Sequence, residues 1–284
     1  MADGQAGITH HEGTHPAPDG CELYWQSWLP ESPRGQVLIL HGFGEHSGRY
    51  QALAGRLVAA GIAVHTFDHR GHGRSGGGRG HIQRWAQFRH DAGRMASELA
   101  DASLPLFCYG HSMGGLMVLD YALHGEGPAP AGVIASAPFL WPEGVPAWRR
   151  ALAAVAARLA PTFTESARIN ASVLSRDPVV VRDYEQDPLV HGEITARLAH
   201  EMFGTARRTR AAGAGIRQPL LIVHGEADRL APAVGSERFF AGVTHPDRTR
   251  RTWPDTRHEP HNDLDRDEVI TTIRDWVLAR ITRV

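Results

Sequence analysis

The chain has 284 residues, of which 42% are hydrophobic, enough to bury the core of one large α/β domain or two small ones. Its formal net charge is -1 and its basic residues, all of them arginine, are scattered, which argues against nucleic acid as a partner. The lack of lysine excludes Schiff-base, pyridoxal and phosphate-loop chemistry. Two cysteines, Cys21 and Cys108, are too few for a disulfide framework or a zinc site.

The chain begins with a polar segment, MADGQAGITHHEGTHPAPDG, which lacks the apolar core of a signal peptide. We expect a solvated tail and no metal site here, because His10, His11 and His15 have no partners at ligand spacing. The longest apolar segment near a helix, residues 151–160, is far shorter than the roughly 20 residues of a membrane span. These features predict a soluble, cytoplasmic protein that needs no cofactor.

Short apolar runs then alternate with longer helical patterns. The runs are continuously apolar, as in strands that are covered on both faces of a parallel sheet. They lie at 35–42, 61–69, 105–111, 131–138 and 219–228, and the helical patterns lie at 50–60, 82–102, 113–123, 234–241 and 266–279. This order predicts the α/β class with a doubly wound, mostly parallel sheet. Residues 21–30 alternate more strictly and predict an antiparallel edge strand.

The alternation stops between residues 140 and 218. No strand pattern is visible there; an Ala- and Arg-rich helix is expected over 148–159, followed by irregular polar stretches. A long insertion without sheet elements predicts a helical cap, or lid, over one edge of the domain. We therefore expect a single domain over residues 1–284, with residues 140–218 as a cap inserted after the sixth strand.

The abrupt junction at residues 110–114 carries the strongest chemical signal. Gly110-His111-Ser112-Met113-Gly114 matches G-x-S-x-G and lies between an expected buried strand and an expected helix. A sharp turn there would strain the serine backbone and lift its hydroxyl above the carboxyl ends of the strands, where open α/β sheets bind ligands. The alternative is a glycine-rich turn with an idle serine, but this context favours a nucleophile.

A serine nucleophile needs a base, and in this fold the acid and then the base follow it in the chain. Residues 219–228 end in a turn with Glu226 and Asp228. Asp228 is the better acid because it lies past the strand end, although a carboxylate in a helix N-terminal turn is the alternative. His258 is preferred as the base by its place in this order, and His261 is its rival.

An oxyanion hole is also expected. One backbone N–H should come from Met113, at a helix N-terminus whose dipole favours negative charge. The second should come from Phe43, in the loop HGFGEHSGRY at residues 41–50.

At this point the chain resembles a known family, the monoacylglycerol lipases of the α/β-hydrolase superfamily. The resemblance extends from about residue 20 to residue 276. It is carried by HGFGEHSGRY, FDHRGHGRSGG, GHSMGG, SVLSRDPVVVRDYEQDPLV, HGEADRL and HEPHND. It implies Ser112, Asp228 and His258 as a catalytic triad and the Phe43 and Met113 amides as the oxyanion hole.

The resemblance further implies a polar end of the pocket that binds the glycerol head of the substrate. The residues concerned are Glu45, Arg49, Tyr184 and His261. For Glu45 and Arg49, which lie four residues apart, a solvated ion pair is the alternative. The cap, with Phe139, Leu140 and Phe163, would line an acyl tunnel and touch lipid surfaces, so peripheral membrane contact belongs to this expectation. The alternative is that the cap helix only completes the core.

The expected activity is hydrolysis of monoacylglycerols to fatty acid and glycerol through an acyl-enzyme, with a small lipid ester as the binding partner. A broad carboxylesterase or a lysophospholipase would share these motifs. A non-catalytic binding protein of the same fold would have a broken triad, whereas serine, acid and base are all present here. Dehalogenases and epoxide hydrolases usually need a carboxylate at position 112. The sequence makes no prediction of oligomeric state.

Overall fold

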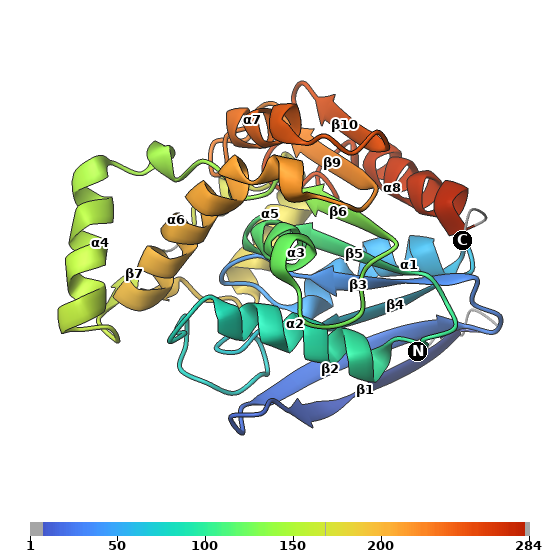
Figure 1. Ribbon diagram of the computed structural model, residues 1–284, viewed down its shortest axis with the longest axis horizontal. Coiled ribbons are helices and arrows are strands. Elements are labelled where there is room, and N and C mark those ends of the chain that lie inside the picture. The colour runs from blue at the N-terminus through green and yellow to red at the C-terminus, as the bar shows by residue number, and fades with distance from the viewer. Residues whose placement is uncertain (1–7, 168, 282–284) are drawn as a thin grey trace.

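An eight-stranded, mostly parallel sheet runs through the centre of the computed structural model (Figure 1), which describes residues 8–167 and 169–281. Its strand order is β1-β2-β4-β3-β5-β6-β9-β10. The strands are β1 (Ile8–Pro16), β2 (Glu22–Pro30), β3 (Gly35–Leu40), β4 (Ile62–Phe67), β5 (Leu106–His111), β6 (Gly132–Ser136), β9 (Leu220–Gly225) and β10 (Arg248–Trp253). β1 and β2 are antiparallel to their neighbours, and the other pairs are parallel. The doubly wound, mostly parallel sheet is thus confirmed.

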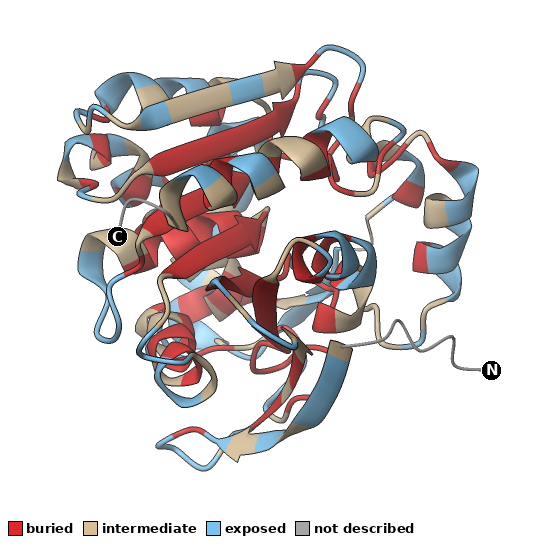
Figure 2. Cartoon of the chain, turned by 90° about the vertical axis from the view of Figure 1, so that its right-hand side faces the viewer, coloured by how far each residue is buried: buried red, intermediate tan, exposed pale blue. Residues whose placement is uncertain are grey.

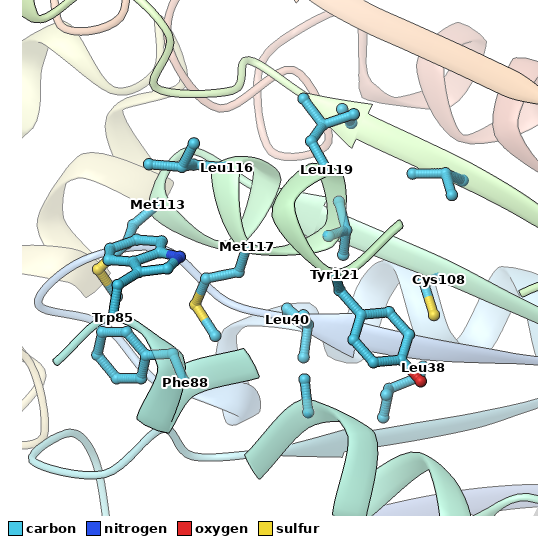
Figure 3. Packing of buried hydrophobic residues seen from close by; sticks show 14 of the residues in the cluster. Leu38, Leu40, Trp85, Phe88, Cys108, Met113, Leu116, Met117, Leu119 and Tyr121 are labelled. Atoms are coloured by element: carbon cyan, nitrogen blue, oxygen red, sulfur yellow. The ribbon is translucent and has the colours of Figure 1, made fainter. Parts of the chain in front are cut away.

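Helices cover both faces of this sheet, which is why its inner strands are apolar along their whole length. Alternate residues of β3 point to opposite faces, so Val37 and Ile39 pack with α1 (Gln51–Val58) and α8 (Arg266–Ile281). Leu38 and Leu40 pack in the second core, part of which Figure 3 shows. That core includes side chains of α2 (Ala86–Leu99), α3 (Met113–His124) and α7 (Val234–Gly242).

The N-terminal segment corrects one prediction. The polar sequence predicts a solvated tail, but residues 8–16 form β1, which pairs with β2 from Ile8 opposite Pro30 to Pro16 opposite Glu22. The polar sequence concealed this strand because an edge strand needs one backbone partner and no buried face. The ring of His10 stacks on Trp28 at a centroid distance of 5.0 Å. β2 is therefore antiparallel, as expected, but is not an edge strand; residues 1–7 lie outside the described residues.

The segment between β6 and β9 contains the expected helix and further helices that were not expected. It contains α4 (Ala147–Leu159), α5 (Pro178–Gln186) and α6 (Ala196–Ala211), with short 3-10 turns at Pro142–Gly144, Ala171–Val173 and Gly213–Gly215. In Figure 1, α4 lies at the outer end of the molecule, beyond α6. Among the described residues, no helix is both long enough and apolar enough to cross a membrane.

Two expectations for this segment were wrong. Its supposedly irregular stretches contain α5 and α6, whose first turns are capped by the side chains of Asp177 and Thr195. The buried side of α6 has Leu198 and Met202 in its first half but small and hydroxyl residues, such as Ala206 and Thr209, in its second, so the apolar pattern is short. The segment also has two three-residue strands, β7 (Thr164–Ser166) and β8 (Glu193–Thr195), which pair with each other. Strands this short leave almost no pattern in the sequence.

Figure 2 shows how burial is distributed over this arrangement: the central strands are buried, whereas α4 is largely exposed. The carboxyl ends of β3, β5 and β9 meet at one edge of the sheet, and the loops that follow these strands bring the expected site residues together.

Candidate active site

Ser112 sits on a sharp turn between β5 and α3. Its backbone has φ 54° and ψ -114°, a left-handed conformation that is rare for a residue with a side chain. The flanking glycines explain why the turn is sterically allowed. A Cβ at Gly110 would lie 2.1 Å from the carbonyl oxygen of Gly114, and a Cβ at Gly114 would lie 2.1 Å from that of Leu40.

Backbone hydrogen bonds hold this strained residue from both sides. The Ser112 N–H donates to the Ser136 carbonyl at 2.9 Å, which ties the turn to β6. The Ser112 carbonyl accepts from Phe139 and from Leu116, both at 3.0 Å. Three hydrogen bonds therefore fix the serine backbone, and a fixed backbone restricts where its hydroxyl can lie.

The three side chains of the expected triad form one hydrogen-bonded chain. Ser112 Oγ lies 2.9 Å from His258 Nε2, and His258 Nδ1 lies 2.8 Å from Asp228 Oδ2. The other Asp228 oxygen, Oδ1, accepts from the amides of Leu230 at 2.8 Å and Ala231 at 3.0 Å. This is the geometry of an activated nucleophile, with its base oriented by an acid.

The charges around the triad favour an ionised Asp228 and a basic His258 imidazole. Burial alone would raise the pKa of Asp228, but the adjacent His258 and His224 hold that pKa well below its usual range. Burial alone would lower the pKa of His258, yet the Asp228 charge raises it above the ordinary value. Glu226, the other acid considered, instead accepts from the Thr252 hydroxyl at the surface.

One expected oxyanion-hole residue, Met113, directly follows Ser112, and the other, Phe43, lines the same cavity as Ser112. Met113 is the first residue of α3, so its N–H has no acceptor four residues earlier in the helix. Phe43 lies in the loop after β3 and, like Ser112, lines a cavity of about 30 Å³. The Glu45 carboxylate braces this loop, because its Oε1 accepts from the Gly42 amide at 2.5 Å and from the Tyr50 hydroxyl at 2.6 Å.

Charged residues form one part of the wall of this cavity. Arg49 makes a two-pronged ion pair with Glu259, at 2.6 and 2.8 Å, and a second ion pair with Glu45. The Arg49 guanidinium also lies 4.8 Å from the ring centre of Tyr184. Burial would raise the pKa of Glu259, but the charge of Arg49 outweighs it and lowers the pKa to about 2. Glu45 and Arg49 are therefore a buried pair and not a solvated one.

His261 does not reach the cavity, which corrects its expected contact with the glycerol head. Its ring stacks on Tyr50 at 4.9 Å, and its Nδ1 lies 3.2 Å from the Tyr109 hydroxyl. Only 1% of the residue is exposed, and burial lowers its pKa to about 4. The cavity is lined by Gly42, Phe43, Glu45, Arg49, His111, Ser112, Ile169, Leu174, Tyr184, His258 and Glu259. Glu45, Arg49 and Tyr184 thus line the cavity, whereas His261 does not.

The apolar residues expected to line an acyl tunnel lie in different places in the structure. Phe163 lines a separate cavity of about 440 Å³, together with Trp148, Leu152 and Ile194. Leu140 is fully buried in the core and Phe139 packs against Phe203, so neither lines that cavity. The prediction was wrong for Leu140 because a position just after a strand is also where core residues lie.

Sequence analysis missed Glu259 altogether. It stands directly after His258, and its partner Arg49 is 210 positions away in the chain. A carboxylate directly after an expected base was a usable signal in the sequence. Only the folded structure, however, brings the loop with Glu259 close to the loop with Arg49.

Comparison with known proteins shows the family of this chain. The family model described as "Serine aminopeptidase, S33" matches residues 31–265. A monoacylglycerol lipase of Mycolicibacterium smegmatis is 34% identical over 96% of this chain and 99% of its own length. The chain is a monoacylglycerol lipase-like member of the α/β-hydrolase family. The predicted family and fold are confirmed, and the protein is a serine hydrolase.

Further members of this hydrolase family agree in both fold and sequence. The crystal structure of Paleococcus ferrophilus monoacylglycerol lipase superposes with a TM-score of 0.84 and 34% identity, covering 91% of this chain and 99% of that one. Human monoglyceride lipase is 29% identical over 92% of this chain and 88% of its own length.

Proposed function

We propose that this hydrolase cleaves monoacylglycerols to free fatty acid and glycerol, with Ser112, His258 and Asp228 as its triad. The observation that carries the proposal is the unbroken hydrogen-bonded chain from Ser112 Oγ through both nitrogens of His258 to Asp228. The substrate class is suggested by the monoacylglycerol lipases that this chain resembles.

In the first half-reaction, Ser112 Oγ attacks the ester carbonyl carbon while His258 Nε2 takes its proton. The carbonyl oxygen becomes an anion that accepts from the Met113 and Phe43 amides. The intermediate then collapses: the bond to the glycerol oxygen breaks, His258 returns the proton to that oxygen, and the acyl group stays on Ser112. In the second half-reaction, water attacks the carbonyl carbon of the acyl group while His258 takes a proton from it. The bond to Ser112 Oγ then breaks, His258 returns the proton to that oxygen, and the fatty acid is released.

Substrate selection follows from the wall around Ser112. Glu45, Arg49 and Glu259 place three buried charges beside the cavity, next to the Tyr184 ring. A small hydroxylated head matches such a wall. A second or third acyl chain there would offer no hydrogen bond to these polar groups, whereas the hydroxyls of a glycerol head can.

A hydrolysis panel tests this substrate class. Mono-, di- and triacylglycerols of one acyl chain are compared with lysophospholipids and short p-nitrophenyl esters. We expect monoacylglycerols to be cleaved faster than triacylglycerols by about tenfold or more. Equal rates on all esters would favour a broad carboxylesterase, and a preference for lysophospholipids a lysophospholipase; either result contradicts the proposed substrate.

We also propose that residues 140–218 act as a lid. Ile169, Leu174 and Tyr184 of this segment close the cavity beside Ser112, and its volume of about 30 Å³ is too small for an acyl chain. Entry of the substrate therefore requires this segment to move. Its α4 helix exposes Trp148, Leu152, Val155 and Leu159, by 64%, 59%, 54% and 82%. These positions repeat every three or four residues, so they form one apolar face that suits a lipid surface.

The lipid contact predicts a measurable loss of vesicle binding. Replacing both Leu152 and Leu159 with aspartate should weaken sedimentation with phosphatidylcholine–phosphatidylglycerol vesicles by about tenfold or more, because each leucine contributes roughly 1.5–3 kcal/mol on burial. Hydrolysis of a soluble short-chain ester should change little. Leu264→Asp is the matched control, since Leu264 is 60% exposed and lies outside the lid. Unchanged binding by the double variant would refute the contact.

A further inference from the structure

His224 is a second histidine that contacts the triad acid. It belongs to β9, four residues before Asp228, and is completely buried. Its Nε2 is 3.2 Å from Asp228 Oδ2, the same oxygen that contacts His258. The steps of ester hydrolysis described above make no use of this second imidazole.

The surroundings of His224 determine where its proton lies. Nε2 faces two acceptors only, the Asp228 carboxylate and the Ala231 carbonyl oxygen at 2.8 Å. Nε2 therefore carries a proton and donates it towards both. On the other side of the ring, Nδ1 is 2.9 Å from Ser236 Oγ, whose hydroxyl also lies 2.9 Å from the Ala233 carbonyl. The ring is thus held at both nitrogens and cannot turn away from Asp228.

With this contact the hydrogen-bonding capacity of Asp228 is filled. Oδ1 accepts from the Leu230 and Ala231 amides, and Oδ2 accepts from His258 and His224. Four donors fix the plane of the carboxylate and hence the direction from which Oδ2 meets the base. They also spread its negative charge, so that less of it acts on His258 alone.

We propose that His224 is a positioning residue of the triad, whose Nε2–H orients the Asp228 carboxylate and moderates its charge towards His258. The inference rests on the proposed role of Asp228 as the triad acid. His224 does not line the cavity beside Ser112. Its loss is therefore expected to change kcat and the pH profile and to leave KM for a short ester unchanged.

Three substitutions of His224 and one of Ser236 separate positioning from packing. The amide nitrogen of a glutamine reaches as far as His224 Nε2 and can donate to Asp228, so His224→Gln should retain kcat within about threefold. An asparagine matches the Nδ1 position only. His224→Asn and His224→Leu should therefore lower kcat by about 10- to 100-fold, the usual effect of losing one hydrogen bond to a charged group. Ser236→Ala, which leaves the Nε2 donor in place, should have little effect.

The pH dependence of kcat is a measurement that a loss of packing at His224 would not by itself change. Without the Nε2–H, more of the Asp228 charge acts on His258, which stays protonated to higher pH. The rising limb of kcat should then move to higher pH in the Asn and Leu variants and stay in place in the Gln variant. His258 also faces His111, whose ring centre is 4.8 Å away, and the charges of Glu259 and Glu45, all of which these substitutions leave intact.

Equal kcat and pH profiles in the Gln, Asn and Leu variants would overturn the proposal. So would a loss of activity in the Gln variant as large as in the Leu variant, because the role would then be one of packing. Asp228→Asn, measured beside them on the same ester, tests the triad itself. If it retains wild-type kcat, the proposed function fails at Asp228, irrespective of what His224 does.

Discussion

Ser112→Ala is expected to lower ester hydrolysis by about a million-fold while the protein stays folded, because loss of one triad member removes the action of the whole unit. The hydroxyl is the group that forms the acyl bond, and its removal breaks the 2.9 Å hydrogen bond to His258 Nε2 but leaves the bond between His258 and Asp228 in place. The backbone at this residue is held by Ser136, Phe139 and Leu116, and none of these bonds needs the side chain. Circular dichroism and thermal unfolding should match the wild type.

A second serine provides the matched control for this substitution. Ser136 is fully buried at the end of β6 and does not line the cavity, so Ser136→Ala should retain most of the activity. A phosphonate that reacts with activated serines should label Ser112 and no other residue, as peptide mass spectrometry would reveal. More than a few per cent of wild-type activity in Ser112→Ala would contradict the assignment of the nucleophile.

His258→Ala is expected to have a similarly large effect, and His261→Ala a small one. The two histidines are three positions apart and almost equally buried, with 3% and 1% exposed. His258 contacts Ser112 Oγ and Asp228, whereas His261 contacts Tyr109 and stacks on Tyr50. Steady-state rates of the two variants decide between them, and an exchange of these outcomes would make His261 the base.

The pH dependence of the same enzymes supports this test. His258 accepts the Ser112 proton only when it is neutral, so the rate rises as His258 loses its proton. The nearby Asp228 charge raises the pKa of His258, and we therefore expect the half-maximal kcat/KM above the ordinary histidine pKa of about 6.5. Burial lowers the pKa of both His111 and His261, so neither adds a second limb in this range. The rise of kcat/KM with pH should persist in the His261→Ala variant.

The sequence by itself determined the elements whose signals are local. The buried strands could be found because parallel strands covered on both faces are apolar without interruption. The turn at Ser112 could be found because Gly110 and Gly114 stand where a Cβ would meet backbone atoms, and no other residue type fits there. The order of nucleophile, acid and base, together with the place of Asp228 past a strand end, predicted Asp228 in preference to Glu226 and His258 in preference to His261.

Only the tertiary structure decided the features that depend on residues distant in the chain. β1 forms because β2 offers it a backbone partner, and its own sequence is mostly polar. Arg49 is neutralised by Glu259, 210 positions away, and His261 is removed from the cavity by packing against Tyr50. Side-chain position and charge pairing in a buried site result from contacts between loops that the sheet brings together, and a linear pattern does not record such contacts.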